Sequence, residues 1–290
     1  MDAIADTPPG APEAASGDPF AAAAGENFPV ASRLIRRDLR PAVIAFYRFA
    51  RAADDVADNP ALAPSAKLAR LDRFASALGG SPGDPHAADL RRALAGHPRA
   101  GEALNAAGRL LGAFRQDARG ASYPDWAALR AYCAMSADPV GRFLLILHDE
   151  APETQRPSDA LCTALQVLNH LQDLRADRDL LGRVYLPSDL LAEAGARPAD
   201  LSASVLSPAA RAAVDRVLDR CDALLNDAEA LPGRIRARGL RGQSTATLVL
   251  ARSLSRRLRH QDPLARRVKA GRGAFARATA AGLWRATWPR

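Results

Sequence analysis

Tyr47–Asp58 reads YRFARAADDVAD and places three aspartates among alanine, phenylalanine, valine and two arginines. On an α-helix, residues at i, i+4, i+7 and i+11 share one face, so Tyr47, Arg51, Asp54 and Asp58 form a single polar stripe. Its neighbours are apolar or small, whereas a solvated helix normally surrounds its acids with other charged groups. We therefore expect Asp54 and Asp58 to be partly buried and compensated by a cation, because an unpaired buried charge is costly.

A second segment, Ala164–Asp177 (ALQVLNHLQDLRAD), repeats this arrangement. Gln166, Asn169, Asp173 and Asp177 again fall on one helical face. Mg²⁺ in proteins takes a few carboxylates together with waters and substrate phosphate oxygens. Two such stripes facing each other across a cavity would hold Mg²⁺ against a diphosphate, while arginine and amide side chains contact its oxygens. A solvated face with ordinary ion pairs is the alternative interpretation of either stripe alone.

The composition favours a soluble, helical protein. The chain has 290 residues, of which 48% are hydrophobic, 25% charged and only 5% aromatic. Alanine and leucine dominate, and β-branched residues rarely cluster, which favours helix over strand. No alternation long enough for a sheet occurs, so we predict an all-α single domain. The predicted helices cover 41–58, 87–95, 99–118, 124–149, 158–178, 208–229 and 234–260.

The basic charge is concentrated at one end. The net charge is +8, and residues 251–290 hold eleven Lys or Arg against one acid, which leaves about −2 for the rest. Charge confined to one end, without a recognition module, argues against a nucleic-acid partner. We predict a disordered segment at 1–25, a helical domain at 26–270 and a basic tail at 271–290. The tail could form an amphipathic helix on an anionic membrane surface, with Trp284 and Trp288 opposite arginines, or remain unstructured.

The remaining bulk features point to the cytoplasm. The three cysteines, Cys133, Cys162 and Cys221, have no metal-ligand spacing and fit a reducing compartment. The N-terminus lacks the basic start of a secretory signal, and no apolar run reaches the ~18 residues of a membrane span. We expect a cytoplasmic protein whose tail makes peripheral contact with the inner membrane surface.

Three segments in this order resemble the squalene/phytoene synthase family of head-to-head prenyl synthases. They are Tyr47–Asp58, Tyr132–Leu145 (YCAMSADPVGRFLL) and Gln166–Pro187 (QVLNHLQDLRADRDLLGRVYLP), and the likeness extends over about 26–270. The resemblance implies an isoprenoid synthase fold, with helices around a central apolar cavity. Its expected walls are 43–57, 129–147 and 161–174.

The resemblance also implies roles for individual residues. The expected catalytic residues and Mg²⁺ ligands are Asp54, Asp58, Asp173 and Asp177, with Asn169 as a further ligand. The residues expected to bind the substrate diphosphate are Tyr47, Arg51, Gln166, Asn169, Arg183, Tyr185 and Arg267. Tyr132, Ser136, Asn169 and His170 are open candidates for positioning an attacking water.

Within the family, the stretches ENFPVASRLI (26–35), FARAADDVAD and LNHLQD look most like bacterial members of hopanoid pathways. Those members convert presqualene diphosphate and water to hydroxysqualene and diphosphate, between two neighbouring pathway enzymes that are candidate transient partners. Gln172 stands where many condensing members have Arg, Asn27 stands where they often have Ser, and no Tyr follows Tyr185. Asn27 and Gln172 are therefore added to the predicted substrate-binding set.

Two alternatives stay open from the sequence. One is a condensing synthase that makes presqualene diphosphate, squalene or phytoene from two prenyl diphosphates such as farnesyl diphosphate. The loss of a cation at Gln172 argues against it, because such an enzyme must hold two diphosphates. The other is a non-catalytic helical assembly or binding protein, which would tend to lose the motif aspartates that this chain retains.

Overall fold

The computed structural model describes residues 34–288, and every regular element in that range is a helix. The all-α prediction is therefore confirmed there, while Asn27 and the segment 1–25 lie outside the described residues. The longer helices are α2 (Arg40–Asp58), α3 (Pro64–Leu78), α4 (Pro85–Ala93), α5 (Ala100–Ala118), α6 (Trp126–Ser136), α7 (Asp138–Leu147), α8 (Gln155–Gln172), α9 (Leu174–Leu181), α11 (Pro208–Ala228), α13 (Arg238–His260) and α14 (Arg272–Thr287). The shorter ones are α10 (Ser188–Glu193), α12 (Leu231–Arg234) and the 3₁₀ turns η2 (Arg37–Leu39), η3 (Pro152–Thr154) and η4 (Pro198–Ser202).

Several predicted helices differ from those observed. The single helix expected over 124–149 is two helices, α6 and α7, because Pro139 sits in the first turn of α7 and cannot donate a backbone hydrogen bond to the preceding turn. The prediction also missed α3 altogether. The helix expected over 158–178 is likewise divided, and Asp173 forms the junction between α8 and α9.

Helical hydrogen bonding continues across this junction. The N–H of Asp173 donates to the carbonyl of Asn169 at 2.9 Å, and the N–H of Asp177 donates to that of Asp173 at 2.7 Å. The two aspartates therefore remain one turn apart, as predicted, although they belong to different helices.

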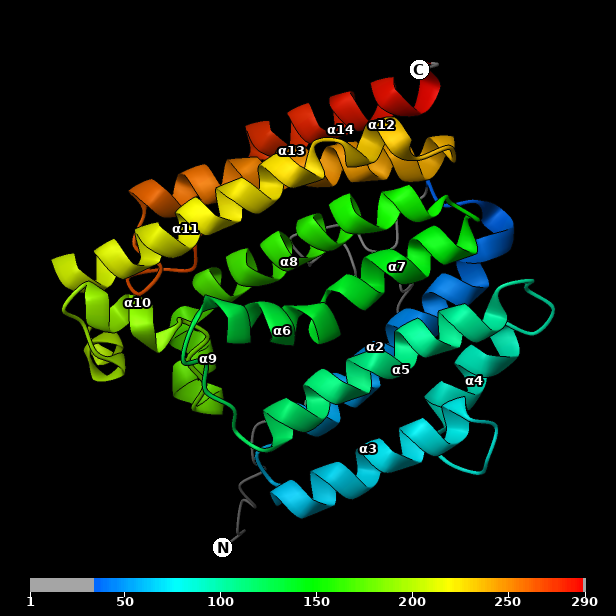
Figure 1. Ribbon diagram of the computed structural model, residues 1–290, viewed down its shortest axis with the longest axis horizontal. Coiled ribbons are helices and arrows are strands. Elements are labelled where there is room, and N and C mark those ends of the chain that lie inside the picture. The colour runs from blue at the N-terminus through cyan, green and yellow to red at the C-terminus, as the bar shows by residue number, and fades with distance from the viewer. Residues whose placement is uncertain (1–33, 289–290) are drawn as a thin grey trace, which may run out of the picture.

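Two apolar cores hold the helices together. In Figure 1, α2 to α5 form one side of the molecule, α11, α13 and α14 form the other, and α6, α7 and α8 run between them. The first core includes Phe46, Phe49 and Phe143, and the rings of Phe46 and Phe143 stack at 4.0 Å between centroids. The second core is rich in leucine and includes Leu168 and Leu254. Burial of each such side chain stabilises the fold by about 1.5–3 kcal/mol.

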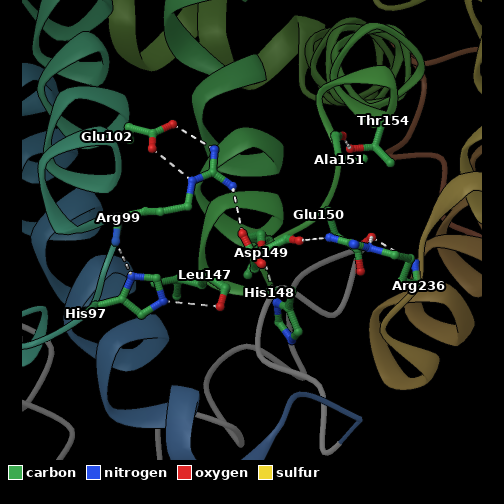
Figure 2. A network of polar contacts seen from close by, with 11 residues as sticks. His97, Arg99, Glu102, Leu147, His148, Asp149, Glu150, Ala151, Thr154 and Arg236 are labelled. Atoms are coloured by element: carbon green, nitrogen blue, oxygen red, sulfur yellow. Dashed lines mark hydrogen bonds and ion pairs between the residues drawn. The ribbon is translucent and has the colours of Figure 1, made fainter.

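A polar network ties the end of α7 to both sides of the molecule (Figure 2). The Glu150 side chain is fully buried, and its carboxylate accepts hydrogen bonds from the N–H groups of Arg236 at 2.8 Å and Ala237 at 2.7 Å, just before α13. Asp149 adopts a left-handed conformation with φ of 52°, and its carbonyl accepts a hydrogen bond from the Arg236 side chain. Its carboxylate lies 3.7 Å from the guanidinium of Arg99, which precedes α5. Glu150 thus satisfies donors that the start of α13 would otherwise leave unpaired.

We expect Glu150→Ala to lower the free energy of unfolding by about 2–3 kcal/mol, because it leaves two buried N–H groups without acceptors. Glu150→Gln, which keeps one acceptor oxygen, should cost less. Urea unfolding followed by circular dichroism measures both. Glu153→Ala, an exposed acid three residues away, is the matched control and should change little. Equal stability of Glu150→Ala and the control would contradict this role.

The C-terminal segment is folded rather than unstructured. Helix α14 packs along α13 with two glycines at the contact, Gly242 and Gly282. A Cβ atom added to Gly242 would lie 2.5 Å from the carbonyl oxygen of Gly282, and the reverse distance would be 2.7 Å. The backbones of the two helices therefore touch, and the alternative of an unstructured tail is wrong for 272–287. No helix in the range 34–288 is both long enough and apolar enough to cross a membrane.

Candidate active site

Acidic residues gather where three helices end. Helix α2 ends at Asp58, Asp117 lies in the last turn of α5, and Asp173 directly follows α8. The C-terminal end of a helix carries partial negative charge from its unpaired carbonyls, so a carboxylate there is unfavourable unless a cation compensates it. The position of these acids therefore predicts cations beside them.

Arg183 supplies one of these cations. It is buried, and Nη1 donates to the carboxylate of Asp58 at 2.6 Å. Its Nη2 lies 3.3 Å from the carbonyl oxygens of both Ala57 and Asp117. One guanidinium thus caps the ends of α2 and α5 and pairs with the first acidic stripe. The structure places Arg183 at the acidic site, as the resemblance implied.

Asp117 is the residue that the sequence analysis missed. Its side chain accepts hydrogen bonds from the hydroxyls of Tyr132 at 2.8 Å and Tyr185 at 3.4 Å, and burial raises its pKa above the ordinary value. A single aspartate on an apolar helix gave only a weak signal. It lies four residues after the buried Ala113, on the inward face of α5, and that placement could have identified it.

His170 connects this group to the second stripe. Its ring stacks on Tyr185 with 3.6 Å between centroids, and Nδ1 lies 3.6 Å from the carboxylate of Asp177. The amide of Gln166 lies 3.1 Å from Nε2 of the same ring. A continuous series of contacts therefore runs from the Asp58–Arg183 pair through Asp117 to Asp177. The structure brings the two predicted stripes into one site.

Arg267 supplies a second cation, at Asp173. Its Nε and Nη2 lie 2.6 and 2.9 Å from the two carboxylate oxygens, which is a bidentate pairing. Gln172 is buried and donates its amide to the carbonyl of Val268, so it fixes the segment that carries Arg267. The sequence predicts the loss of a cationic contact at Gln172. The structure shows that a guanidinium is nevertheless present at Asp173, which weakens that argument against a condensing enzyme.

The other predicted substrate-binding residues lie around these pairs. Arg51 is exposed on α2, 3.6 Å from Asp54 and 3.0 Å from Asp55. Tyr47 is half-buried one turn before it, and Asn169 is half-buried on α8. Arg51 therefore lies at the edge of the acidic group, and Asn169 lies one turn before Asp173. Of the proposed water-positioning residues, Tyr132 and His170 belong to the network, whereas Ser136 is a buried hydroxyl on α6 without a hydrogen-bond partner.

The carboxylates of the site fit a divalent cation. Burial and repulsion from Asp58 raise the pKa of Asp54 to about 7, although about 40% of its side chain still reaches solvent. Burial likewise raises the pKa of Asp173, against the opposing effect of Arg267. Among residues 34–288 no three acidic, histidine or cysteine side chains come together as a ready-made metal cage. Mg²⁺ suits such a site, since it binds through one or two carboxylates and completes its shell with waters and phosphate oxygens.

An apolar cavity of about 100 Å³ lies between α7, α8, α12 and α13. Its lining includes Leu144, Leu161, Leu165 and Leu240, and most of the surface exposed to it is apolar. Of the expected walls at 129–147 and 161–174, the parts 140–145 and 161–165 contribute to its lining. The expected wall at 43–57 is not part of this cavity, because the apolar face of α2 packs into the first core instead, and the contribution of α12 and α13 was missed.

Comparison with known proteins places this arrangement in a family. The profile of the squalene/phytoene synthases matches residues 21–274. The chain belongs to the squalene/phytoene synthase family. It is 41% and 42% identical to the hydroxysqualene synthases of Zymomonas mobilis and Rhodopseudomonas palustris, in each case over 84% of this chain and 82% of the relative.

A solved structure agrees with the assignment. The crystal structure of squalene synthase HpnC from Alicyclobacillus acidocaldarius superposes with a TM-score of 0.69 at 32% identity, over 80% of this chain and 87% of that one. The chain is thus a prenyl synthase with the isoprenoid synthase fold of its family.

Proposed function

We propose that the protein is a hydroxysqualene synthase, which converts presqualene diphosphate and water to hydroxysqualene and diphosphate in squalene and hopanoid biosynthesis. The observation that carries the proposal is the 41–42% identity to hydroxysqualene synthases over 84% of the chain. A match of that length on 290 residues must include both acidic segments. The reaction makes the protein a carbon–oxygen lyase acting on a diphosphate.

Mg²⁺ is the proposed cofactor, held by Asp54 and Asp58 on one side and by Asp173, Asp177 and Asn169 on the other. Bound there, it would neutralise charge on the departing diphosphate. The raised pKa values of Asp54 and Asp173 support this proposal, because they indicate carboxylates whose negative charge the protein alone does not fully compensate.

Residues of the chain would bind the diphosphate, surround the carbocation and orient the water. Arg183 and Arg267 hold carboxylates in place and present guanidinium groups to phosphate oxygens, with Arg51 at the open edge. The C–O bond breaks with its electron pair leaving on the diphosphate, and the carbocation rearranges against apolar walls that keep stray bases away. A single water then adds to the cation and loses a proton. Tyr132 and His170 lie where ordered hydroxyl and imidazole groups could orient it.

The proposed setting follows from the substrate. Presqualene diphosphate and hydroxysqualene carry long hydrocarbon chains, which supports a cytoplasmic enzyme working peripherally at the inner membrane surface. The same chemistry supports transient contact with the enzymes that supply the diphosphate and consume the alcohol. A condensing synthase, a prenyltransferase acting on farnesyl diphosphate, is the second candidate, because Arg267 retains a cation beside the second motif.

Incubation of the purified protein with Mg²⁺ and no nicotinamide tests the proposal. Presqualene diphosphate and farnesyl diphosphate are supplied separately, and the lipids are identified by mass spectrometry. We expect hydroxysqualene from presqualene diphosphate and no product from farnesyl diphosphate. Presqualene diphosphate formed from farnesyl diphosphate would establish the condensing function instead. Loss of product on chelation of the metal, with recovery on adding Mg²⁺, tests the cofactor.

A further inference from the structure

Helix α14 carries its large apolar side chains on the outside. Its face toward α13 is made of small residues, Ala274, Ala278 and Gly282. The exposed large hydrophobic residues on the helix and its C-cap are Phe275, Leu283, Trp284 and Trp288. An amphipathic helix of a soluble protein normally shows the opposite distribution. Figure 1 shows α14 at the edge of the molecule with α13 beneath it, so its outer face is open.

Three of these side chains, Leu283, Trp284 and Trp288, lie together at the C-terminal end of α14, and Phe275 lies more than two turns earlier on the helix. Within residues 34–288, only Leu180 and Val205 are comparable exposed large hydrophobic residues away from α14. Trp284 and Trp288 are 59% and 57% exposed, and their rings stack at 4.6 Å between centroids with 7° between planes. Tryptophan favours the boundary between water and lipid, because its large ring is apolar and its N–H is polar.

The segment that carries these side chains has charges of one sign. Residues 263–290 contain seven Lys or Arg and no acid. Arg272 and Arg277 are exposed on α14 itself. At the start of the helix, Arg256, Arg257 and Arg277 line a hollow of about 480 Å³ that also has His260 and no acidic residue in its lining. Basic groups beside exposed apolar side chains fit a surface that has both negative charge and an apolar layer, as an anionic lipid bilayer does.

A second copy of the chain fits this surface less well. A two-fold dimer would bring the same surface of both copies together, and the arginines of each α14 would face those of the other, with no acid on either α14 to pair with them. An anionic lipid surface, by contrast, provides phosphate groups for the arginines and a hydrocarbon layer for the tryptophans and Leu283.

We propose that the outer face of α14, with the adjoining basic hollow, is the docking surface for an anionic phospholipid bilayer. The segment just before α14 contacts the active site, through Arg267 at Asp173 and the Val268 carbonyl at Gln172. Docking would therefore hold, on the membrane, the helix that directly follows the segment in contact with the acidic site. These residues would form the peripheral membrane contact that the proposed function includes, and the contact does not depend on which prenyl diphosphate the enzyme uses.

Vesicle co-sedimentation of the full chain tests the proposal. Vesicles of phosphatidylcholine alone are compared with vesicles that also contain phosphatidylglycerol. We expect binding to the anionic vesicles, weaker binding at high salt, and little binding to phosphatidylcholine. The triple variant Leu283→Ser/Trp284→Ser/Trp288→Ser should lower the partition coefficient by about tenfold or more. Arg272→Ser/Arg277→Ser should remove much of the salt dependence.

The matched control is Val205→Ser, which removes an equally exposed apolar side chain away from α14 and should bind like the parent protein. Turnover of substrate dispersed in detergent should be unchanged in the triple variant, which shows that the enzyme remains folded and that only docking is lost. The proposal is overturned if the parent protein fails to bind anionic vesicles, or if the triple variant binds equally well. It is also overturned if sedimentation shows a dimer that the triple variant converts to a monomer.

Discussion

Asp54→Ala and Asp173→Ala are each expected to lower turnover by about a thousandfold or more, a loss of about 4 kcal/mol of transition-state stabilisation. Both carboxylates lie at the acidic site, and each has a raised pKa. Neither should unfold the protein. Removing Asp54 should instead raise the free energy of unfolding at neutral and higher pH, because the folded state favours the protonated form of its carboxyl group. Its ionised form therefore costs stability progressively from about pH 4 to pH 7 and fully above that.

Two measurements separate these effects. Turnover is compared with the melting temperature at pH 8, where we expect Asp54→Ala to melt at the same temperature as the parent protein or higher. Asp55→Ala is the matched control, since Asp55 is the next residue on the same helix, is exposed and pairs with Arg51. It should keep turnover within about twofold, as expected for an exposed ion pair. Full activity in Asp54→Ala, or an equal loss in Asp55→Ala, would remove the metal-site assignment.

The first stripe could be predicted because its information is local. Helical periodicity depends only on neighbouring residues, so the sequence of α2 was enough to place Asp54 and Asp58 on one face. The second stripe was placed correctly for a partly wrong reason. Asp173 and Asp177 are one turn apart, but Asn169 belongs to α8, which ends at Gln172, whereas Asp177 belongs to α9. Asp177 contacts the rest of the site through His170.

The sequence alone could not show which arginine pairs with which aspartate of the site. Arg183 lies 125 residues from Asp58, and Arg267 lies 94 residues from Asp173. The family resemblance named both arginines without their partners. The partners of Asp117 could not be predicted for the same reason, since they are Tyr132, Tyr185 and a guanidinium from three later segments. Contacts between distant segments follow from the packing of the two cores, which periodicity does not specify.

Arg183→Ala is expected to lower the free energy of unfolding by about 2–4 kcal/mol and to abolish turnover, because it removes the buried partner of a half-buried ion pair together with its contacts to two backbone carbonyls. Asp58 would then face Asp54 without the Arg183 guanidinium, and the carbonyls of Ala57 and Asp117 would lose the donor that they share. Arg183→Lys keeps the charge but cannot reproduce the planar fork, so we expect intermediate stability and low turnover.

A double-mutant cycle with Asp58→Asn decides whether the ion pair is the cause. If the charge left on Asp58 is what destabilises Arg183→Ala, then adding Asp58→Asn should restore part of the lost stability while turnover stays absent. The comparison pair is Arg115 with Asp72, an ion pair on the surface between α5 and α3. Its removal should cost at most about 1 kcal/mol and leave turnover intact. If Arg183→Ala were no more costly than Arg115→Ala, then Arg183 would not be the residue that holds the ends of α2 and α5 against the acidic site.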